Sequence, residues 1–325
     1  MVWVTFDEIV DTTSSAVALS QLRHTVGGGA LVVDRRGSPP LPEALATLPI
    51  VVVELCDGVD PDAYSNQSAG DVVLDSEADA AEVVAAIDQH PQAATALALL
   101  LRDSERRSIP DGIAAESATY STLQAGPEFQ SWLQQHRRKS RPPETQPPVR
   151  IERDEDVLRL VLQRSQVRNA FNAATREALL DGLLIAAAEP GVRVELRGDG
   201  PAFCAGGDLD EFGTADDPAS AHLVRVARSA GYAIAAVADR VTAYLHGACI
   251  GAGIELPAFA GRVVAAPDAT FALPEVGMGL IPGAGGTVSL PRRIGRQRTA
   301  WLAITGQRID ASTALAWRLI DTIDS

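Results

Sequence analysis

Short hydrophobic runs alternate with stretches of helical periodicity throughout residues 149–325. Two runs at 149–153 and 157–162 predict strands joined by a tight turn, and residues 172–184 predict a helix with Asn172 as its N-cap. The same reading gives strands at 192–197, 241–245, 263–266 and 270–273, and helices at 223–237, 254–259, 296–304 and 311–317. Alternation of strand, strand and helix predicts a layered α/β fold.

The pattern before residue 139 is weaker but has the same mixed character. It predicts strands at 30–33, 50–53 and 71–74, and helices at 77–87, 91–102, 111–125 and 127–135. Residues 139–148 are rich in proline and polar side chains and have no apolar period, which is typical of a linker. We therefore divide the chain into an N-terminal accessory α/β module that ends in helices (1–138), a linker (139–148) and a core (149–325).

Composition and charge exclude several classes of protein. The 325 residues carry 42 acidic and 28 basic side chains, a formal net charge of −14, and no basic patch of the kind that binds nucleic acid. No uncharged apolar run approaches the roughly 20 residues that span a bilayer. The three cysteines, an odd number, form no CxxC or Cys/His spacing, so we expect neither disulfides nor a metal site. The N-terminus lacks signal-peptide features, and we expect a cytoplasmic location.

Two glutamates lie in glycine-rich apolar turns. Glu255 ends the segment 246–255, and Glu275 begins the glycine-rich stretch 275–286. Apolar surroundings disfavour the charged form of a carboxylate and raise its pKa. Two such groups in one cavity can share a proton or hold a water molecule, which suits acid–base chemistry. Taken singly, Glu255 could be a carboxylate at a helix start and Glu275 a salt-bridged turn residue.

Two glycine turns are candidate donors to a negatively charged oxygen. The turn at 201–210 follows the strand 192–197, and the turn at 247–255 follows the strand 241–245 and opens a helix. Glycines let backbone N–H groups approach a ligand closely, and a helix start favours negative charge. Either turn alone could be an ordinary turn. The glycines at 247, 251 and 253 do not have the G-x-G-x-x-G spacing of a dinucleotide site.

Several motifs in order resemble the enoyl-CoA hydratase/isomerase (crotonase) family. The resemblance is carried by residues 168–172, 202–209, 247–256, 273–287, 292–296 and 305–311, and it extends over about 150–325. It implies the ClpP/crotonase spiral of ββα repeats and a homo-oligomer, either a trimer or a hexamer. It also implies an acyl-CoA thioester as the substrate, with no cofactor because coenzyme A is part of that substrate.

The resemblance also assigns roles to single residues. The backbone N–H groups of Gly207 and Ala252 would hold the thioester oxygen, and Glu255 and Glu275 would orient a water molecule at C3. Because hydratases of the family have glutamate at both positions, the resemblance favours addition of water to a 2-trans-enoyl-CoA in fatty acid metabolism. The expected substrate and coenzyme A contacts are Arg168, Ala170, Ala205, Gly206, Asp208, Leu209, Gly251, Pro274 and Gly283.

Two alternatives and one departure accompany this interpretation. The chain could perform another reaction of the family, such as isomerisation or dehydration of a specialised acyl-CoA, or it could be a non-catalytic partner subunit. Members of the family continue with helices beyond the position matched by residue 325, whereas residues 91–137 here look like those helices. We hypothesise that residues 1–138 are a degenerate or permuted crotonase-like module that covers the site in the same chain or in a neighbouring subunit. An unrelated accessory domain is the alternative.

Overall fold

The N-terminal part contains a four-stranded parallel sheet. The computed structural model describes residues 2–15, 17–18, 29–58, 68–138, 145–215 and 217–324. The sheet has the order β1 (Val2–Thr5), β2 (Ala30–Asp34), β3 (Val51–Leu55) and β4 (Val72–Leu74), with helix α1 (Phe6–Ser14) after β1 and helix α3 (Glu77–Gln89) after β4. The predicted strands at 30–33, 50–53 and 71–74 are confirmed, whereas the sequence pattern did not indicate β1 or α1.

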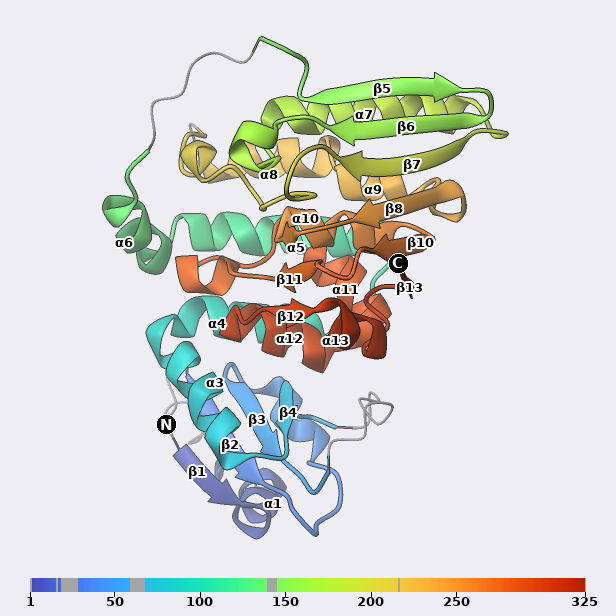
Figure 1. Cartoon of the computed structure of the whole chain (residues 1–325). Helices are drawn as coiled ribbons and strands as arrows, with labels where there is room; N and C mark the ends of the chain where they lie inside the picture. Colours follow the sequence, from blue (N-terminus) through green and yellow to red (C-terminus); the bar gives the residue numbers. More distant parts are fainter. Residues whose placement is uncertain are drawn as a thin grey trace.

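Three helices connect this sheet to the rest of the molecule. They are α4 (Pro91–Arg102), α5 (Ile109–Gln124) and α6 (Pro127–Gln135), as the sequence predicts. Prolines occupy the first turn of all three helices. Backbone N–H groups in a first turn make no intrahelical hydrogen bond, so proline costs nothing there. Figure 1 shows α4 and α5 crossing the middle of the molecule, between the N-terminal sheet and the sheet that contains β5 to β8.

The C-terminal part is built on two further sheets. The larger has the order β13-β10-β8-β7-β6-β5 and is parallel apart from the β5–β6 pair, and the smaller has the order β12-β11-β9. The strands are β5 (Val149–Asp154), β6 (Val157–Leu162), β7 (Arg193–Gly198), β8 (Val241–Leu245), β9 (Ala248–Ile250), β10 (Arg262–Ala265), β11 (Thr270–Ala272), β12 (Ile309–Asp310) and β13 (Thr322–Ile323). The predicted mixed α/β class is confirmed.

Helices cover these sheets and place the loops that matter for function. They are α7 (Ala173–Ala188), α8 (Pro218–Ala227), α9 (Ala230–Ala235), α10 (Ala252–Glu255), α11 (Gly286–Ile294), α12 (Arg296–Thr305) and α13 (Ala311–Ala316), with 3₁₀ turns at Glu43–Thr47, Ser165–Val167, Leu209–Glu211, Ala238–Arg240, Pro257–Phe259 and Glu275–Met278. Asn172 caps α7 as predicted, since its side chain accepts the N–H of Thr175. Among the described residues, no helix has the length and apolarity required to cross a membrane.

Two predicted helices differ from the observed ones. The single helix expected at 223–237 is two helices, α8 and α9, because the side chain of Ser229 caps a new helix by accepting the N–H of Tyr232. The helix expected at 254–259 changes after Glu255 into a 3₁₀ turn that begins at Pro257, which has no N–H for an α-helical hydrogen bond.

The hydrophobic core is continuous across the predicted linker. One cluster of buried side chains includes Leu97 of α4, Ile113 of α5 and Phe129 of α6 together with residues of the C-terminal sheets. Gly112 of α5 faces Val288 of α11 so closely that an added Cβ would lie 2.9 Å from the valine. Helices 91–135 therefore cover the core of their own chain, while the domain division and the crotonase-like origin of residues 1–138 stay predictions.

A buried ionic cluster joins the N-terminal sheet to α4 and α12. Asp71 precedes β4 and accepts from the Arg102 guanidinium at 2.6 Å, and Arg296 of α12 lies 3.5 Å from the same carboxylate. Arg102 also donates to the backbone carbonyl of Leu48. Removing one partner would leave an uncompensated buried charge, which typically costs about 3–5 kcal/mol.

We predict that residues 149–325 do not fold as an independent unit. The isolated fragment would expose the apolar surfaces that α4, α5 and α6 cover, so it should show no cooperative thermal transition by circular dichroism. Adding residues 1–138 as a second polypeptide should restore the transition. A soluble fragment 149–325 that unfolds cooperatively without this addition would refute the role assigned to the helices.

Candidate active site

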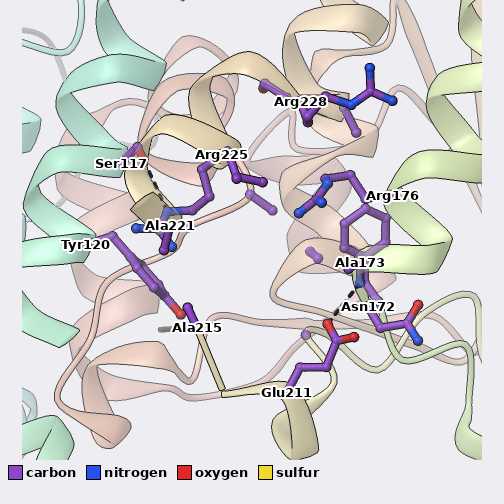
Figure 2. Close-up of a pocket in the computed structure, with 18 of the residues that line it drawn as sticks. Ser117, Tyr120, Asn172, Ala173, Arg176, Glu211, Ala215, Ala221, Arg225 and Arg228 are labelled. Atoms are coloured by element: carbon purple, nitrogen blue, oxygen red, sulfur yellow. Dashed lines mark hydrogen bonds between the residues drawn. The ribbon is translucent and has the colours of Figure 1, made fainter. Parts of the chain in front are cut away.

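The predicted site residues meet in a cavity of about 510 Å³. Glu255, Glu275, Gly207 and Ala252 all line it, and one wall is formed by α5 of the N-terminal part. Figure 2 shows the cavity, with Ser117 and Tyr120 of α5 on one side and Asn172, Ala173 and Arg176 on the opposite side. The residues that α5 contributes are Ile113, Glu116, Ser117, Tyr120 and Gln124.

The two predicted glutamates are both buried at this cavity. The exposed fraction is 2% for Glu255, which ends α10, and 7% for Glu275, which begins a 3₁₀ turn. Oε2 of Glu275 is buried and has no hydrogen-bond partner in the part of the chain that the structure describes. Gly251 has a φ of +50°, and a Cβ there would overlap Oε1 of Glu275, so the position requires glycine on both grounds.

Four successive backbone N–H groups at the start of α11 are divided between two carboxylates. Oε2 of Glu255 accepts the N–H groups of Ala284 and Gly286 at 2.7 and 2.9 Å. The carboxylate of Glu116, from α5, accepts those of Gly285 and Thr287 at 2.7 and 2.9 Å, and also the Thr287 hydroxyl at 2.7 Å. The donors thus alternate along the chain between a core residue and a residue of the N-terminal part.

The third carboxylate, Glu116, was not predicted. It is 2% exposed and lines the same cavity as Glu255 and Glu275. Its backbone position could be anticipated, because residues 111–125 predict a helix, and Ile113, Glu116 and Tyr120 recur at three- and four-residue spacing on one face. Its partners could not be anticipated, because they lie more than 160 positions later in the chain.

Burial shifts the proton affinity of all three carboxylates in the same direction. Desolvation raises the pKa of Glu255 to about 7, while the N–H groups of Ala284 and Gly286 lower it. The pKa of Glu116 rises to about 8 through burial and then through the charge of Glu255, whereas the hydrogen bonds from Thr287 and Gly285 lower it. The pKa of Glu275 is raised well above its usual range by burial and then by Glu255. The site therefore combines groups suited to give and accept protons near neutral pH.

The two predicted oxyanion donors have free N–H groups in the described structure. Phe171 donates to the carbonyl of Gly206 at 2.7 Å and accepts from Asp208 at 2.9 Å, which leaves the N–H of Gly207 outside this pairing. Ala252 is the first residue of α10, where N–H groups have no intrahelical partner. The two turns are in contact, since a Cβ on Gly251 would lie 3.6 Å from the Cα of Gly206.

The remaining predicted contacts divide into two groups. Asp208 and Gly283 line the cavity, and the carboxylate of Asp208 forms a buried ion pair with Arg164 at 2.9 Å. The others are not among the lining residues of the described structure, and their contact with substrate stays a prediction: Arg168, Ala170, Ala205, Gly206, Leu209, Gly251 and Pro274. Of these, Arg168 has a left-handed φ of 53° and accepts the N–H of Ala205 at 2.9 Å, so it shapes the first glycine turn.

Three arginines of the cavity wall were not predicted either. Arg176 comes from α7, Arg225 from α8, and Arg228 follows α8 directly. They lie outside the motifs that resemble the family. No signal in the sequence separates them from the other surface arginines.

We predict that the free energy of unfolding falls as pH rises between about pH 5 and pH 8. In the unfolded chain Glu116 ionises at its ordinary value of 4.5, whereas the folded protein keeps its proton up to about 8. The unfolded state therefore binds fewer protons in this window, and each such group lowers stability by about 1.4 kcal/mol per pH unit. Urea unfolding at a series of pH values should show that the free energy of unfolding falls less steeply with pH in Glu116→Gln than in the wild type.

Glu128 provides the matched control for this measurement. Its carboxylate also accepts two backbone N–H groups at a helix start, those of Gln92 and Ala93, but it is only partly buried. Glu128→Gln makes the same change of carboxylate to amide at a helix start outside the cavity, so it measures the effect of the substitution itself. Equal slopes for the wild type and Glu116→Gln would contradict a raised pKa of Glu116.

Curated relatives with similar sequences match the C-terminal part of the chain. The 2,3-dehydroadipyl-CoA hydratase of Escherichia coli (strain K12) is 33% identical over 174 residues, which cover 53% of this chain and 68% of that protein. The probable enoyl-CoA hydratase of Rhodobacter capsulatus is 36% identical over 184 residues, covering 54% of this chain and 70% of that protein. The chain thus spans about two thirds of the length of these relatives.

Solved structures and a family model agree with these relatives. An enoyl-CoA hydratase from Thermoplasma volcanium GSS1 is 34% identical with a TM-score of 0.51, and the match covers 55% of this chain and 72% of that one. An enoyl-CoA hydratase from Bacillus anthracis is 32% identical with a TM-score of 0.50, covering 55% and 70%. These matches confirm the predicted crotonase-like fold of the core. A model of the enoyl-CoA hydratase/isomerase family matches residues 152–325. The chain therefore belongs to the enoyl-CoA hydratase/isomerase family.

Proposed function

We propose that this protein is an enoyl-CoA hydratase, which adds water syn across a 2-trans-enoyl-CoA to give a 3-hydroxyacyl-CoA. The observation that carries the proposal is the presence of two buried carboxylates, Glu255 and Glu275, in one cavity with the free N–H groups of Gly207 and Ala252. The names of several relatives as hydratases support it. No cofactor is needed, because coenzyme A enters as part of the substrate.

The thioester carbonyl would lie between the two backbone donors. Its oxygen accepts the N–H groups of Gly207 and Ala252, which withdraws electron density from C3 and stabilises the enolate-like species formed when water adds there. Donors of this kind are effective because they are already oriented, and the loss of one typically costs about 3–4 kcal/mol of barrier. The dipole of α10 acts in the same direction, since Ala252 lies at its N-terminus.

The two glutamates would divide the proton transfers between them. Glu255, held by the N–H groups of Ala284 and Gly286, accepts a hydrogen bond from the water and orients its oxygen towards C3. Glu275, whose Oε2 has no protein partner in the described structure, gives its proton to C2 and takes one proton from the attacking water. The product gains one hydroxyl group and one hydrogen, and both carboxylates return to their starting states.

The pKa shifts fit these two roles. Burial raises the pKa of Glu275 well above its usual range, which suits a group that gives a proton to C2. The pKa of Glu255 rises only to about 7, because two backbone donors favour its charged form. Isomerisation moves a double bond and needs only one carboxylate to transfer the proton. Hydration also needs a group that orients the water, so the presence of two carboxylates favours hydration. Fatty acid metabolism as the pathway, the homo-oligomer and the cytoplasmic location stay predictions.

The proposed roles are tested by replacing each glutamate with its uncharged isostere. Glu255→Gln and Glu275→Gln should each lower kcat for hydration of crotonyl-CoA by about 10²–10⁴-fold, the usual contribution of a general acid or base. Loss of the enoyl absorbance measures the rate. Glu195→Gln, a substitution on β7 outside the cavity, is the control and should retain wild-type activity. Wild-type rates in both variants would show that the mechanism is wrong.

A further inference from the structure

The cavity has a cationic wall that the proposed hydration step does not use. Arg176, Arg225 and Arg228 line it, and Figure 2 shows Arg176 and Arg225 extending into the same space from α7 and α8. Arg176 and Arg228 both pair with Glu177, which lies outside the lining, so one carboxylate serves two guanidinium groups. Positive charge therefore exceeds negative charge at this wall.

Arg225 has neutral partners only. Its guanidinium donates to the hydroxyl of Ser117 at 3.2 Å and to the amide oxygen of Gln124 at 3.3 Å, and it lies 4.7 Å from the ring centre of Tyr120. A further bond goes to the hydroxyl of Ser121. In the part of the chain that the structure describes, no carboxylate lies within ion-pair distance of it.

The two facing arginines repel each other. Burial lowers the pKa of Arg225, and the cation of Arg176 lowers it further, whereas Tyr120 and Glu116 act in the opposite direction. Like charges that share a partly desolvated cavity are unfavourable unless an anion lies between them. The carboxylate of Glu116 accepts hydrogen bonds from the start of α11, and that of Glu211, which also lines the cavity, accepts the N–H of Ala173.

We propose that Arg176 and Arg225 bind a carboxylate at the far end of the substrate's acyl chain. The preferred substrates would then be thioesters of enoic acids that carry a second, terminal carboxylate. This inference rests on the proposed function, because it places the thioester at Gly207 and Ala252 and the tail towards α7 and α8. Guanidinium groups suit the task, since they form two parallel charge-assisted hydrogen bonds with a carboxylate.

The size of the cavity favours the acyl tail over the phosphates of coenzyme A as the source of the anion. A single cavity of about 510 Å³ contains both the arginines and the glutamates. The pantetheine arm separates the thioester sulfur from the phosphates, so a phosphate at Arg225 would have to return to the cavity that already holds the thioester. A terminal carboxylate on the acyl chain would meet the arginines from within the cavity that also holds the thioester donors.

Binding of unreactive saturated thioesters tests the inference. By calorimetry, the wild type should bind glutaryl-CoA at least about tenfold more tightly than pentanoyl-CoA, which has the same chain length without the carboxylate. Arg176→Gln and Arg225→Gln should each weaken glutaryl-CoA binding by about 10–100-fold and change pentanoyl-CoA binding by less than about twofold. Arg197→Gln is the matched control, because that guanidinium also lies over a tyrosine ring, that of Tyr244, but outside the cavity.

N-acetylcysteamine thioesters of the same two acids, which lack the phosphates, complete the design. Preference for the glutaryl thioester should persist with them. The inference would be overturned if the wild type bound the two acyl groups with equal affinity, or if the variants lost affinity for both equally. It would also be overturned if the preference for the glutaryl group disappeared in the thioesters without phosphates. These measurements need no turnover, so inactivity towards enoyl-CoA would refute the proposed function alone.

Discussion

The N-terminus of α11 is the point on which the site depends. Its four successive N–H groups, from Ala284 to Thr287, are taken alternately by Glu255 and Glu116. Helix N-termini carry partial positive charge and favour carboxylates, and here two carboxylates share one terminus. Gly286 permits the approach, because a Cβ there would lie 2.6 Å from Cγ of Glu255. One set of backbone donors thus fixes a catalytic candidate and anchors α5.

This arrangement makes the N-terminal part a component of the site. Glu116 and Tyr120 form part of the cavity wall, and Phe129 of α6 belongs to the same buried cluster as the core sheets. On the far side, Arg102 and Arg296 meet at Asp71, which links the N-terminal sheet to α4 and α12. The family model, by contrast, matches only residues 152–325. The α5 wall of the cavity therefore comes from a part of the chain that the family model does not match.

The sequence predicted the local features well and the long-range ones poorly. Gly207, Ala252, Glu255 and Glu275 lie in motifs whose order along the chain is informative, and the structure brings all four to one cavity. Glu116 sits in a correctly predicted helix, but its partners are 169 and 171 positions away. Periodicity reports which face of a helix is buried and carries no information about what buries it. For the same reason, no pattern distinguished Arg225 from a solvated arginine.

The cavity contains polar groups of two kinds, which suits a substrate with two polar ends. Three carboxylates with raised pKa values lie at the α10 and α11 end, and the arginines lie at the α7 and α8 end. A ligand that places a thioester at one end and an anion at the other would satisfy both.

In the proposed active site, one chain supplies both the backbone donors and the α5 wall. A crystal structure of the protein with a bound saturated acyl-CoA tests it most directly. We expect the thioester oxygen to lie within about 2.7–3.1 Å of the nitrogens of Gly207 and Ala252. The acyl chain should lie against Tyr120 of the same chain, with Glu116 still bound to Gly285 and Thr287. An acyl group covered by another subunit, or a thioester oxygen away from both nitrogens, would contradict it.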